Sequence, residues 1–479
     1  MGVRVQRSFR RGRFVKIVGA VAVVWVSLMI YGQNKPLPKG VSLEGAAHTA
    51  AHVEFLTDCT YQRNGQPVRE QAIFNRVHQI IDGAERFILL DFFLFNGVQP
   101  KGGSFPALAE EMTRRLVEKK QRAPQVDIVL ITDAINRSYG AEEPEHFRRL
   151  RAGGVRIMYT DTGKLRDSNF IYSAWWRLFC RWFGAGGNGW LPSPFAQDGP
   201  AMTLRGYLSL LNFKANHRKV VVSEKEALIT SANPHDASAY HSNIAIVAQG
   251  PVVQDVVESE AAVARFSGGT VPGWEIPVRP QSGEMHLRLL TEGKIKARLL
   301  TALARCGNKA SVRMAMFYLS DREVIAGLLG AAARGAEVRL LLDPNKDAFG
   351  RSKNGIPNRP VAQELVEKSR GAIQVRWYGT HGEQFHSKLT MISLPEETVL
   401  IGGSANLTRR NLDDLNLESC LEVTAPADSQ VIRSATGYFE RMWRNDGGVY
   451  SLEFSEFSEN SPFRYALYRF QEWSGMSTF

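Results

Sequence analysis

The sequence predicts an α/β protein made of two similar halves and preceded by one N-terminal transmembrane helix. Three features support this prediction: an apolar run behind a cluster of arginines, short apolar strands that alternate with helical patterns, and a motif that occurs twice. The 479 residues are enough for two or three domains. With 44% hydrophobic and 22% charged residues, the composition is globular and excludes a disordered or fibrous chain.

The N-terminal segment, residues 1–44, combines positive charge with an apolar run. The net charge of the chain is +11, and residues 1–39 carry +8 of it, so the body is almost neutral. An apolar run from Ile17 to Tyr31 follows the arginines. We expect a retained signal anchor with a cytoplasmic N-terminus and a body outside the cytoplasm, in the periplasm. A cleaved signal peptide and a buried N-terminal strand are the alternatives.

The body of the chain reads as two α/β halves. Apolar runs typical of buried strands lie at 86–95, 127–133, 312–319 and 338–343, with helical patterns at 107–120 and 321–334. We expect a first half at 45–266, a Gly/Pro-rich linker at 267–284, a second half at 285–450 and a C-terminal tail at 451–479.

Each half contains a His-x-Lys motif, then an apolar strand and a small-residue turn that ends in Asn. Residues i and i+2 of a strand share a face, so each histidine points into the same space as its lysine. One such triplet arises easily by chance, but two in the same context indicate a site. Its candidate residues are His217, Lys219 and Asn233 in the first half, and His386, Lys388, Ser404 and Asn406 in the second.

These residue types suit the cleavage of a phosphodiester. Imidazole acts as a nucleophile or as an acid near neutral pH, the lysines supply positive charge, and the Asn and Ser side chains supply neutral donors. A metal site would need clustered His, Asp or Glu ligands, and the sequence has no such spacing. We therefore expect neither a metal nor a cofactor.

With both motifs, most of residues 50–445 resemble the phospholipase D superfamily, whose signature is HxKxxxxD followed by a G-G/S-x-N turn. The nearest branch is that of bacterial membrane-anchored phospholipases D and cardiolipin synthases. The resemblance implies a bilobal α/β/α/β/α fold with pseudo-twofold symmetry, in which both motifs meet at the interface. It also implies metal-independent chemistry, in which one histidine forms a phosphohistidine and the other protonates the leaving alcohol. By this analogy His217 is the nucleophile and His386 is the general acid.

The sequence departs from the family pattern around these histidines. Glu224 and Ser393 occupy the aspartate position of the two motifs, and the first turn lacks its glycines. A carboxylate late in each motif usually orients its histidine, and Glu418 fills that place in the second half. The aligned residue of the first half is Ala245, and the candidate substitutes there are Asp236 and His241. A carboxylate on the His386 side leaves the reverse assignment of the two histidines open.

An aromatic-rich insert, at about 160–211, precedes the first motif. Val155 and His217 are 62 residues apart, whereas Val375 and His386 are 11 apart. The insert holds four of the nine tryptophans within 16 residues: Trp175, Trp176, Trp182 and Trp190. It is interpreted as the core of a subdomain, as an amphipathic element at lipid headgroups, or as a surface that stacks single-stranded bases. The near-neutral body argues against the last interpretation.

Together these features predict a membrane-anchored phosphodiesterase that acts on phospholipids. It would hydrolyse the headgroup ester or transfer the phosphatidyl group to an alcohol such as phosphatidylglycerol, as cardiolipin synthases do. The alternatives are a nuclease or phosphodiesterase of the same superfamily and a non-catalytic lipid-binding pseudoenzyme. The expected partners are phospholipid and membrane, and no nucleic-acid partner is expected.

Overall fold

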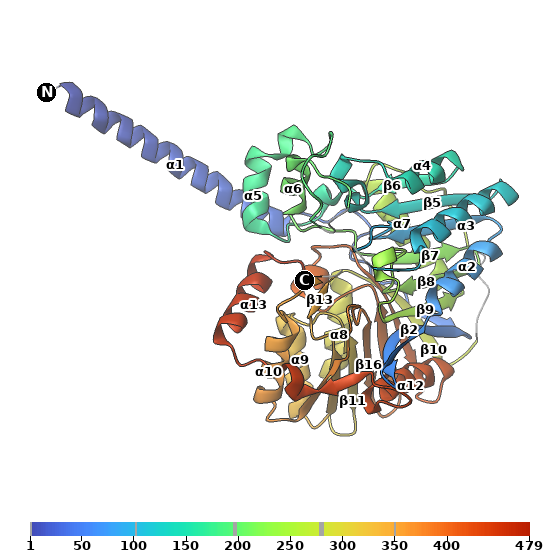
Figure 1. Cartoon of the computed structure of the whole chain (residues 1–479). Coiled ribbons are helices and arrows are strands. Elements are labelled where there is room, and N and C mark those ends of the chain that lie inside the picture. The colour runs from blue at the N-terminus through green and yellow to red at the C-terminus, as the bar shows by residue number, and fades with distance from the viewer. Residues whose placement is uncertain (1, 101–102, 195–198, 277–281, 349–350) are drawn as a thin grey trace.

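The computed structural model describes residues 2–100, 103–194, 199–276, 282–348 and 351–479. Two large β-sheets with helices on both sides form the body, and one long helix, α1, leaves it (Figure 1). Parts of the expected insert, 195–198, and of the expected linker, 277–281, lie outside the described residues.

The first sheet has the strand order β3-β2-β9-β8-β7-β4-β5-β6 within the described residues. The parallel strands β4, β5 and β6 lie at one side, and the antiparallel strands lie at the other. Its strands are β2 (Val53–Arg63), β3 (Gln66–Glu70), β4 (Phe87–Phe92), β5 (Asp127–Thr132), β6 (Arg156–Tyr159), β7 (Lys219–Ser223), β8 (Glu226–Thr230) and β9 (Asn243–Gln249).

The second sheet has the order β1-β10-β18-β17-β16-β11-β12-β15-β19 in the described part of the chain. Its strands are β1 (His48–Ala50), β10 (Met285–Thr291), β11 (Ser311–Met316), β12 (Glu337–Leu342), β15 (Ile373–Tyr378), β16 (Lys388–Ser393), β17 (Thr398–Gly403), β18 (Ser419–Ala425) and β19 (Ser451–Glu453). A separate short pair consists of β13 (Asp347–Ala348) and β14 (Arg351–Ser352).

The two sheets share one arrangement of seven strands, which confirms the predicted duplication. The order β2-β9-β8-β7-β4-β5-β6 of the first sheet corresponds to β10-β18-β17-β16-β11-β12-β15 of the second. The parallel pairs also correspond, since β4–β5–β6 matches β11–β12–β15. In both halves the His-x-Lys strand, β7 or β16, lies beside the first parallel strand.

Helices complete a five-layer α/β/α/β/α arrangement. On the outer face of the first sheet lie α2 (Ile73–Gly83), α3 (Leu108–Arg122) and α4 (Glu145–Ala152). The outer face of the second carries α8 (Gly293–Ala304), α9 (Arg322–Ala333) and α10 (Asn358–Lys368). Between the sheets, α7 (Val252–Phe266) and α12 (Gln430–Arg444) join a core to which both halves contribute. The remaining helices are α1 (Gly2–Asn34), α5 (Phe170–Phe179), α6 (Leu204–Leu210), α11 (Arg409–Leu412) and α13 (Pro462–Ser474).

The central core explains why the strands read as continuous apolar runs. Both faces of strands such as β4, β7 and β17 are buried, so their side chains do not alternate with polar ones. The sheets approach closely at Gly402, where an added Cβ would lie 2.9 Å from the Cδ1 atom of Ile244 in the other sheet. Gly402 of the second turn therefore has a packing role between the halves.

Two segments cross the boundaries expected from the sequence. We expected the first half to begin at residue 45, but β1 pairs with β10 and so belongs to the second sheet. We expected a tail from residue 451, but β19 pairs with β15 and ends the same sheet. Both strands lie at sheet edges and have only three residues, which is too few to show a periodic pattern in the sequence.

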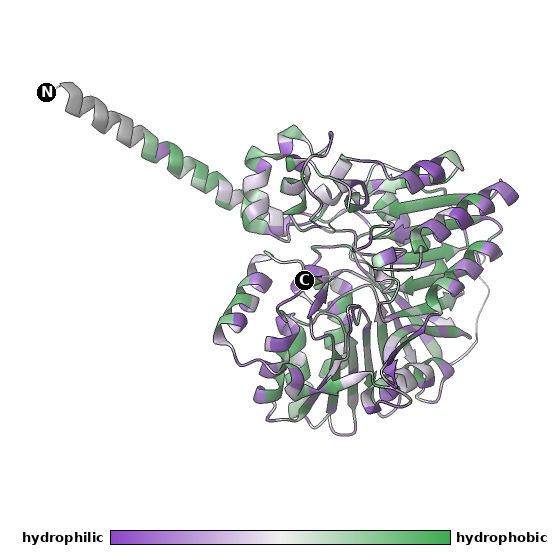
Figure 2. Cartoon of the chain, in the orientation of Figure 1, coloured by the Kyte–Doolittle hydropathy of each residue, from purple (hydrophilic) through white to green (hydrophobic). Residues whose placement is uncertain are grey.

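Helix α1 is long and apolar enough to cross a membrane. The qualifying stretch, Phe14–Asn34, has a mean hydropathy of 2.2 and is unburied, which contradicts a buried N-terminal strand. Its described part is strongly hydrophobic in Figure 2. The end of α1 contacts the body near α5: the Trp25 Nε1–H donates to the Ile171 carbonyl (3.2 Å), and the Asp167 N–H donates to the Gly32 carbonyl (2.9 Å).

Candidate active site

Each His-x-Lys motif is held in place by the opposite half. The His217 N–H donates to the Leu417 carbonyl, and the His386 N–H donates to the Ser242 carbonyl, both at 2.9 Å. This exchange is reciprocal, as an approximate twofold axis between the halves requires. The two motifs therefore meet at the interface, where the sequence placed them.

Matching aspartates tether the two approach segments. Asp133 follows β5 and accepts the N–H of Asn216 through Oδ2, and Asp343 follows β12 and accepts the N–H of Phe385, both at 2.8 Å. Each aspartate thereby fixes the backbone directly before its motif histidine.

His217 is oriented by a carboxylate from the other half. Its Nδ1 lies 2.8 Å from Oε1 of Glu418, and its ring centroid lies 5.0 Å from that of Phe93. Because an ionised carboxylate only accepts hydrogen bonds, Nδ1 carries the proton and Nε2 keeps its lone pair. His217 is therefore arranged as a nucleophile or base at Nε2.

His386 is oriented by an amide instead. Its Nδ1 lies 3.1 Å from Oδ1 of Asn243, and its ring lies 4.9 Å from that of Phe317. The amide of Asn243 is fixed, because Oδ1 also accepts from the Ser231 hydroxyl (2.9 Å) and Nδ2 donates to the His241 carbonyl (3.1 Å). The two histidines thus share a geometry but differ in the charge of their partner.

This pairing differs from the sequence alignment in two ways. Glu418 contacts His217 rather than His386, because each orienting residue crosses the interface. In addition, Ser231 and Ser404 occupy equivalent turns, bonded to Ile244 and Ser419 respectively, so the counterpart of Glu418 is Asn243 and not Ala245. The reverse assignment of the two histidines was left open because Glu418 was expected beside His386. Glu418 lies beside His217 instead, so that reason for exchanging the roles is absent.

The motif lysines occupy matching buried positions. Lys219 Nζ donates to the His217 carbonyl (2.6 Å), and Lys388 Nζ donates to the His386 carbonyl (2.8 Å). Each ammonium also lies over an aromatic ring, Phe93 at 5.3 Å or Phe317 at 5.0 Å. Phe93 and Phe317 were not singled out from the sequence, although each directly follows an apolar strand.

The asparagine and serine candidates have separate tasks. Asn233 accepts the N–H of Leu94 through Oδ1 (3.1 Å), which leaves its NH2 group as a donor. Asn406 is buried, and its Oδ1 has no partner among the described residues. Ser404 donates to Glu418, as does Asn411, so both support the carboxylate that orients His217.

Glu224 does not join this group. Its carboxylate accepts the N–H groups of Glu85 (2.8 Å) and Arg86 (3.2 Å) beyond the far end of β7, about 20 Å along the strand from His217. Its contacts are those of a loop cap at the base of the sheet. Asp236 likewise accepts the Ala109 N–H (3.0 Å), and His241 lies 5.9 Å, ring to ring, from His386 without replacing Asn243.

Burial lowers the pKa of the basic side chains of the site and so favours their uncharged forms. It lowers the pKa of His217 to about 4, although Glu418 opposes the shift, and the pKa of Lys219 to about 7. Burial and the neighbouring cationic groups lower the pKa of His386 and of Lys388 well below their usual ranges. Lys219 and His217 both act on His386, so the two motifs lie within electrostatic reach of each other. Such a site gains protons and positive charge when an anion enters.

We expect a phosphodiester anion to bind more weakly as pH rises through about 7. Below that value Lys219 is protonated in the free protein, and above it the cation is lost, so affinity falls by up to about tenfold per pH unit. Calorimetry with diethyl phosphate, which stays a monoanion over this range, measures the effect. Lys219→Met should bind weakly at every pH. An affinity that is flat from pH 6 to 9 would contradict the assignment.

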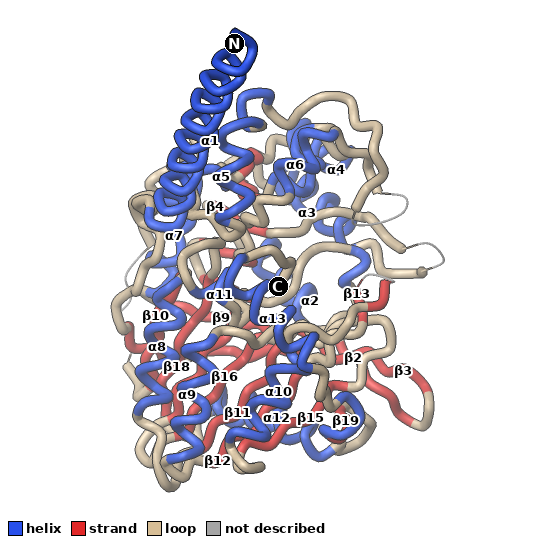
Figure 3. The backbone as a smooth tube through the Cα atoms, turned by 90° about the vertical axis from the view of Figure 1, so that its left-hand side faces the viewer, coloured by secondary structure: helices blue, strands red, loops and turns tan. Residues whose placement is uncertain are grey.

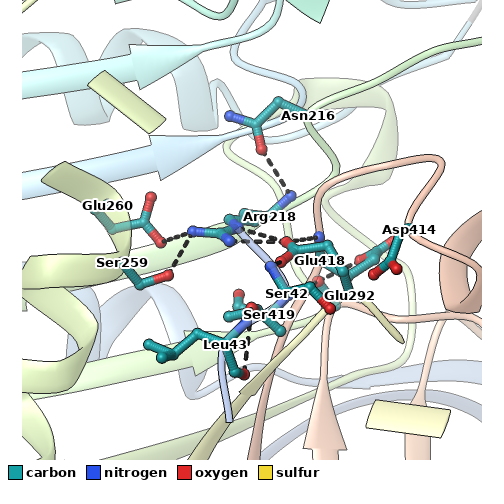
Figure 4. Close-up of polar contacts among 12 residues, drawn as sticks. Ser42, Leu43, Asn216, Arg218, Ser259, Glu260, Glu292, Asp414, Glu418 and Ser419 are labelled. Atoms are coloured by element: carbon teal, nitrogen blue, oxygen red, sulfur yellow. Dashed lines mark hydrogen bonds and ion pairs between the residues drawn. The ribbon is translucent and has the colours of Figure 1, made fainter. Parts of the chain in front are cut away.

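Behind His217 lies a buried charge cluster that the sequence analysis missed (Figure 4). The Arg218 guanidinium donates to Glu292 (2.7 Å), Glu260 (3.1 Å) and Ser259 (2.8 Å), and its side chain is fully buried. Arg218 lies between His217 and Lys219 in the motif, so strand alternation directs it away from the site and into the protein. That alternation is the signal that could have identified it.

Glu292 connects this cluster to Glu418 and to the segment that follows α1. One oxygen of Glu292 accepts both the Arg218 guanidinium and the Glu418 N–H (3.0 Å), and the other accepts the Ser42 N–H (2.7 Å). Breaking such a buried pair from one side usually costs about 3–5 kcal/mol, because the remaining charge is left uncompensated. The cluster therefore fixes the backbone that carries Glu418.

The candidate lipid-interface residues belong to the insert, whose helix α5 contacts α1. Trp182 and Trp190 are 69% and 70% exposed, Trp175 is also exposed, and Trp176 is half-buried. The Arg181 guanidinium lies 4.2 Å from the Trp182 ring. These tryptophans are therefore not the core of a subdomain. The inner face of α5, which includes Phe170, supplies the packing instead.

A cavity of about 460 Å³ lies next to the site in the first half. Its lining includes Leu94, Asn136, His146 and His235, but neither motif histidine. It adjoins the candidate site through Leu94, whose N–H is bonded to Asn233.

Comparisons with known proteins agree with the α/β fold of two similar halves. Residues 299–443 match the family model of the cardiolipin synthase, phospholipase D-like domain. No curated protein matches significantly. The solved phosphatidylserine synthase of Haemophilus influenzae Rd KW20 is similar in fold, with 11% identity, a TM-score of 0.56, and coverage of 90% of this chain and 94% of that one.

Two further solved structures are more distant. The polyphosphate kinase of Porphyromonas gingivalis has 14% identity over 89% of this chain and 54% of its own, with a TM-score of 0.46. The phospholipase D family member Nuc of Salmonella typhimurium has 18% identity over 35% of this chain and 98% of its own, with a TM-score of 0.28.

Proposed function

Because the chain belongs to the phospholipase D superfamily, we propose that it is a membrane-anchored phosphodiesterase that acts on phospholipids through a phosphohistidine intermediate. One observation carries this proposal. Two buried histidines face a common site, and only one of them, His217, has a carboxylate on Nδ1. A pair with matched geometry but unequal basicity suits a reaction that needs a nucleophile and an acid.

In the first step, Nε2 of His217 attacks the phosphorus of the diester. The phosphorus–oxygen bond to the leaving alcohol breaks, and His386, which takes up a proton on Nε2 when the anionic diester binds, donates that proton to the alcohol oxygen. The ring of His217 becomes cationic as the phosphorus–nitrogen bond forms, and Glu418 stabilises this charge through Nδ1–H. His386 has the neutral Asn243 as its partner, so it gives up a proton more readily.

In the second step, water or an alcohol attacks the phosphohistidine. His386 takes the proton of the attacking oxygen, the phosphorus–nitrogen bond breaks, and His217 returns to its neutral state. Lys219, Lys388, Asn233 and Asn406 are proposed to hold the anionic oxygens in both steps. The choice between hydrolysis and transfer depends on which acceptor reaches the intermediate, and phosphatidylglycerol is the acceptor that cardiolipin synthesis uses.

Phospholipid is the proposed substrate because of what surrounds the site. The apolar stretch of α1 leaves the body beside α5, and exposed tryptophans lie on the same part of the surface. Tryptophan and arginine both favour the level of the lipid headgroups. With the positive charge before this stretch, we propose a cytoplasmic N-terminus and a body on the outer, periplasmic side of the membrane.

Mass spectrometry of lipid products tests this proposal. The purified full-length protein is incubated with vesicles that contain labelled phosphatidylglycerol. We expect phosphatidic acid if water is the acceptor, or cardiolipin and free glycerol if a second phosphatidylglycerol is. The variant His381→Ala, which changes an exposed histidine near His386, should behave like the wild type.

The same assay separates the other function classes. Cleavage of single-stranded DNA without any lipid product would indicate a nuclease. Binding to the vesicles without any product would indicate a pseudoenzyme. Either result would contradict the proposed activity.

A further inference from the structure

We propose that the C-terminal helix α13 is a second membrane-docking surface, which holds the rim of the catalytic site at the lipid headgroups. The inference rests on the membrane placement proposed above. It adds a lipid contact in the second half, whereas α1 and the aromatic insert belong to the first part of the chain. The occupant we propose is a bilayer surface.

Helix α13 carries aromatic side chains on its outward side as well as on the side that packs against the core, where Tyr468 is buried. Its outward side carries Phe463, Phe470 and Trp473, which are 75%, 47% and 58% exposed. Their spacing of seven and three residues places them on one stripe of the helix. The inward side carries Glu472, which is buried and accepts the Arg409 N–H (2.8 Å) and the Ser320 hydroxyl (2.7 Å). An outward apolar stripe of this kind favours contact with an apolar phase.

Helix α13 lies on the side of the body from which α1 leaves. Figure 1 shows α1, α5 and α13 at the same side, and Figure 3, which views that side directly, shows them facing the viewer. The rings of Phe170 in α5 and Trp473 in α13 meet edge to face at 5.5 Å. Gly475 packs so closely on the same region that an added Cβ would lie 1.8 Å from the Ser168 carbonyl oxygen. Helix α13 of the second half therefore packs directly against α5 of the first half.

The residues after α13 reach the rim of the catalytic site. The Arg410 guanidinium donates to the carbonyls of Ser477 (3.1 Å) and Thr478 (2.6 Å). The buried ring of Phe479 lies 6.1 Å from that of Tyr318, which in turn stacks against Phe317 at 3.9 Å. Because Phe317 contacts His386, α13 connects to the active site through only a few residues.

A lipid surface fits this face better than another protein does. The chain itself is proposed to bring a bilayer to this side, since the apolar stretch of α1 is unburied and its C-terminal part contacts α5. Arginines lie over aromatic rings on this side of the protein: Arg181 lies over Trp182 (4.2 Å), and in α13 the exposed Arg469 lies over Tyr465 (5.8 Å). Guanidinium groups next to exposed aromatic rings suit phosphate headgroups above acyl chains.

Photo-crosslinking to lipid tests the surface without requiring activity. A photoreactive phenylalanine analogue replaces Phe463 or Phe470, one at a time, in the full-length protein reconstituted into vesicles of phosphatidylethanolamine and phosphatidylglycerol. The control position is Val449, which is 47% exposed but is bonded to Gln62 at the end of β2. We expect about tenfold more lipid adduct at positions 463 and 470 than at 449, because burial of such a side chain strongly favours the lipid contact. Equal yields, or adducts with protein in place of lipid, would overturn the inference.

A functional variant tests the link to the active site. Phe463→Ser with Phe470→Ser should lower activity on vesicle phospholipid by about tenfold and leave cleavage of a soluble short-chain diester unchanged. Val449→Ser should change neither. If the double variant melts at a lower temperature than the wild type, its activity is not used, and the lipid adducts at positions 463 and 470 decide whether α13 contacts lipid. If the wild type cleaves no diester, the proposed function fails, and the adducts still decide whether α13 contacts lipid.

Discussion

Replacing His217 or His386 with alanine is expected to lower turnover by about 10³- to 10⁵-fold. On the proposed mechanism, the first variant lacks the group that forms the covalent bond, and the second lacks the acid that protonates the leaving alcohol. The loss should appear in kcat on lipid and on soluble diester alike, because both substrates use the same bond-breaking step. Single-turnover kinetics in detergent micelles measures it.

Two controls make this result specific. His381→Ala should keep full activity, and each active-site variant should melt at a temperature close to that of the wild type. Because the proposed mechanism uses the two histidines and no metal, EDTA should leave turnover unchanged. Full activity in either alanine variant, or a loss with EDTA that a metal restores, would exclude the mechanism.

The carboxylate of Glu418 should contribute far more to kcat than the amide of Asn243, which occupies the matching position in the other half. Glu418→Gln is expected to lower kcat by about 10²- to 10⁴-fold, because the amide can donate to Nδ1 of His217 and so stabilise the wrong tautomer. Asn243→Asp changes the matching position and should cost no more than about tenfold, by raising the pKa of His386 and weakening it as an acid. Rapid-quench kinetics on a soluble diester compares the two variants.

This pair of variants is a matched test of the role assignment. If Asn243→Asp proves as damaging as Glu418→Gln, the two histidines are equivalent. If Glu418→Gln is silent, His217 does not carry the developing positive charge, and His386 becomes the candidate nucleophile.

The fold could be predicted from the sequence to a large extent. The duplicated strands, the helices between them and the apolar N-terminal segment all have strong local patterns, and each appears in the structure. The sheet edges could not be predicted. The three residues of β1 and of β19 carry no periodicity, and their pairing depends on strands far away in the chain.

The structure brings the predicted histidines, lysines and asparagines of the candidate site together, but Glu224 lies outside it and the partners of the two histidines were not predicted. The motif histidines and lysines are fixed by strand alternation, which sequence displays directly. The partners of the histidines cross between the halves, so Glu418 faces His217 and Asn243 faces His386. A linear alignment cannot show such an exchange, and it also placed Ala245 rather than Asn243 opposite Glu418.

Other site residues were missed because their roles depend on three-dimensional packing. Arg218 carries no motif of its own, and Glu292 is 74 residues away from it in the chain. Helix α13 was assigned only to a C-terminal tail, although its outward stripe of Phe463, Phe470 and Trp473 is visible in the sequence. From the sequence alone, the same stripe is equally compatible with a side of the helix that packs against the core. Only the structure shows that it faces outward.

Trapping the covalent intermediate tests the central claim most directly. The protein is mixed with labelled phosphatidylglycerol, quenched in alkali within the first turnover, digested and mapped by mass spectrometry. We predict a phosphatidyl or phosphoryl group on His217, with more of it in the variant His386→Ala when a diester with a good leaving group is used. A label on His386, or turnover with no labelled histidine at any time, would contradict the account.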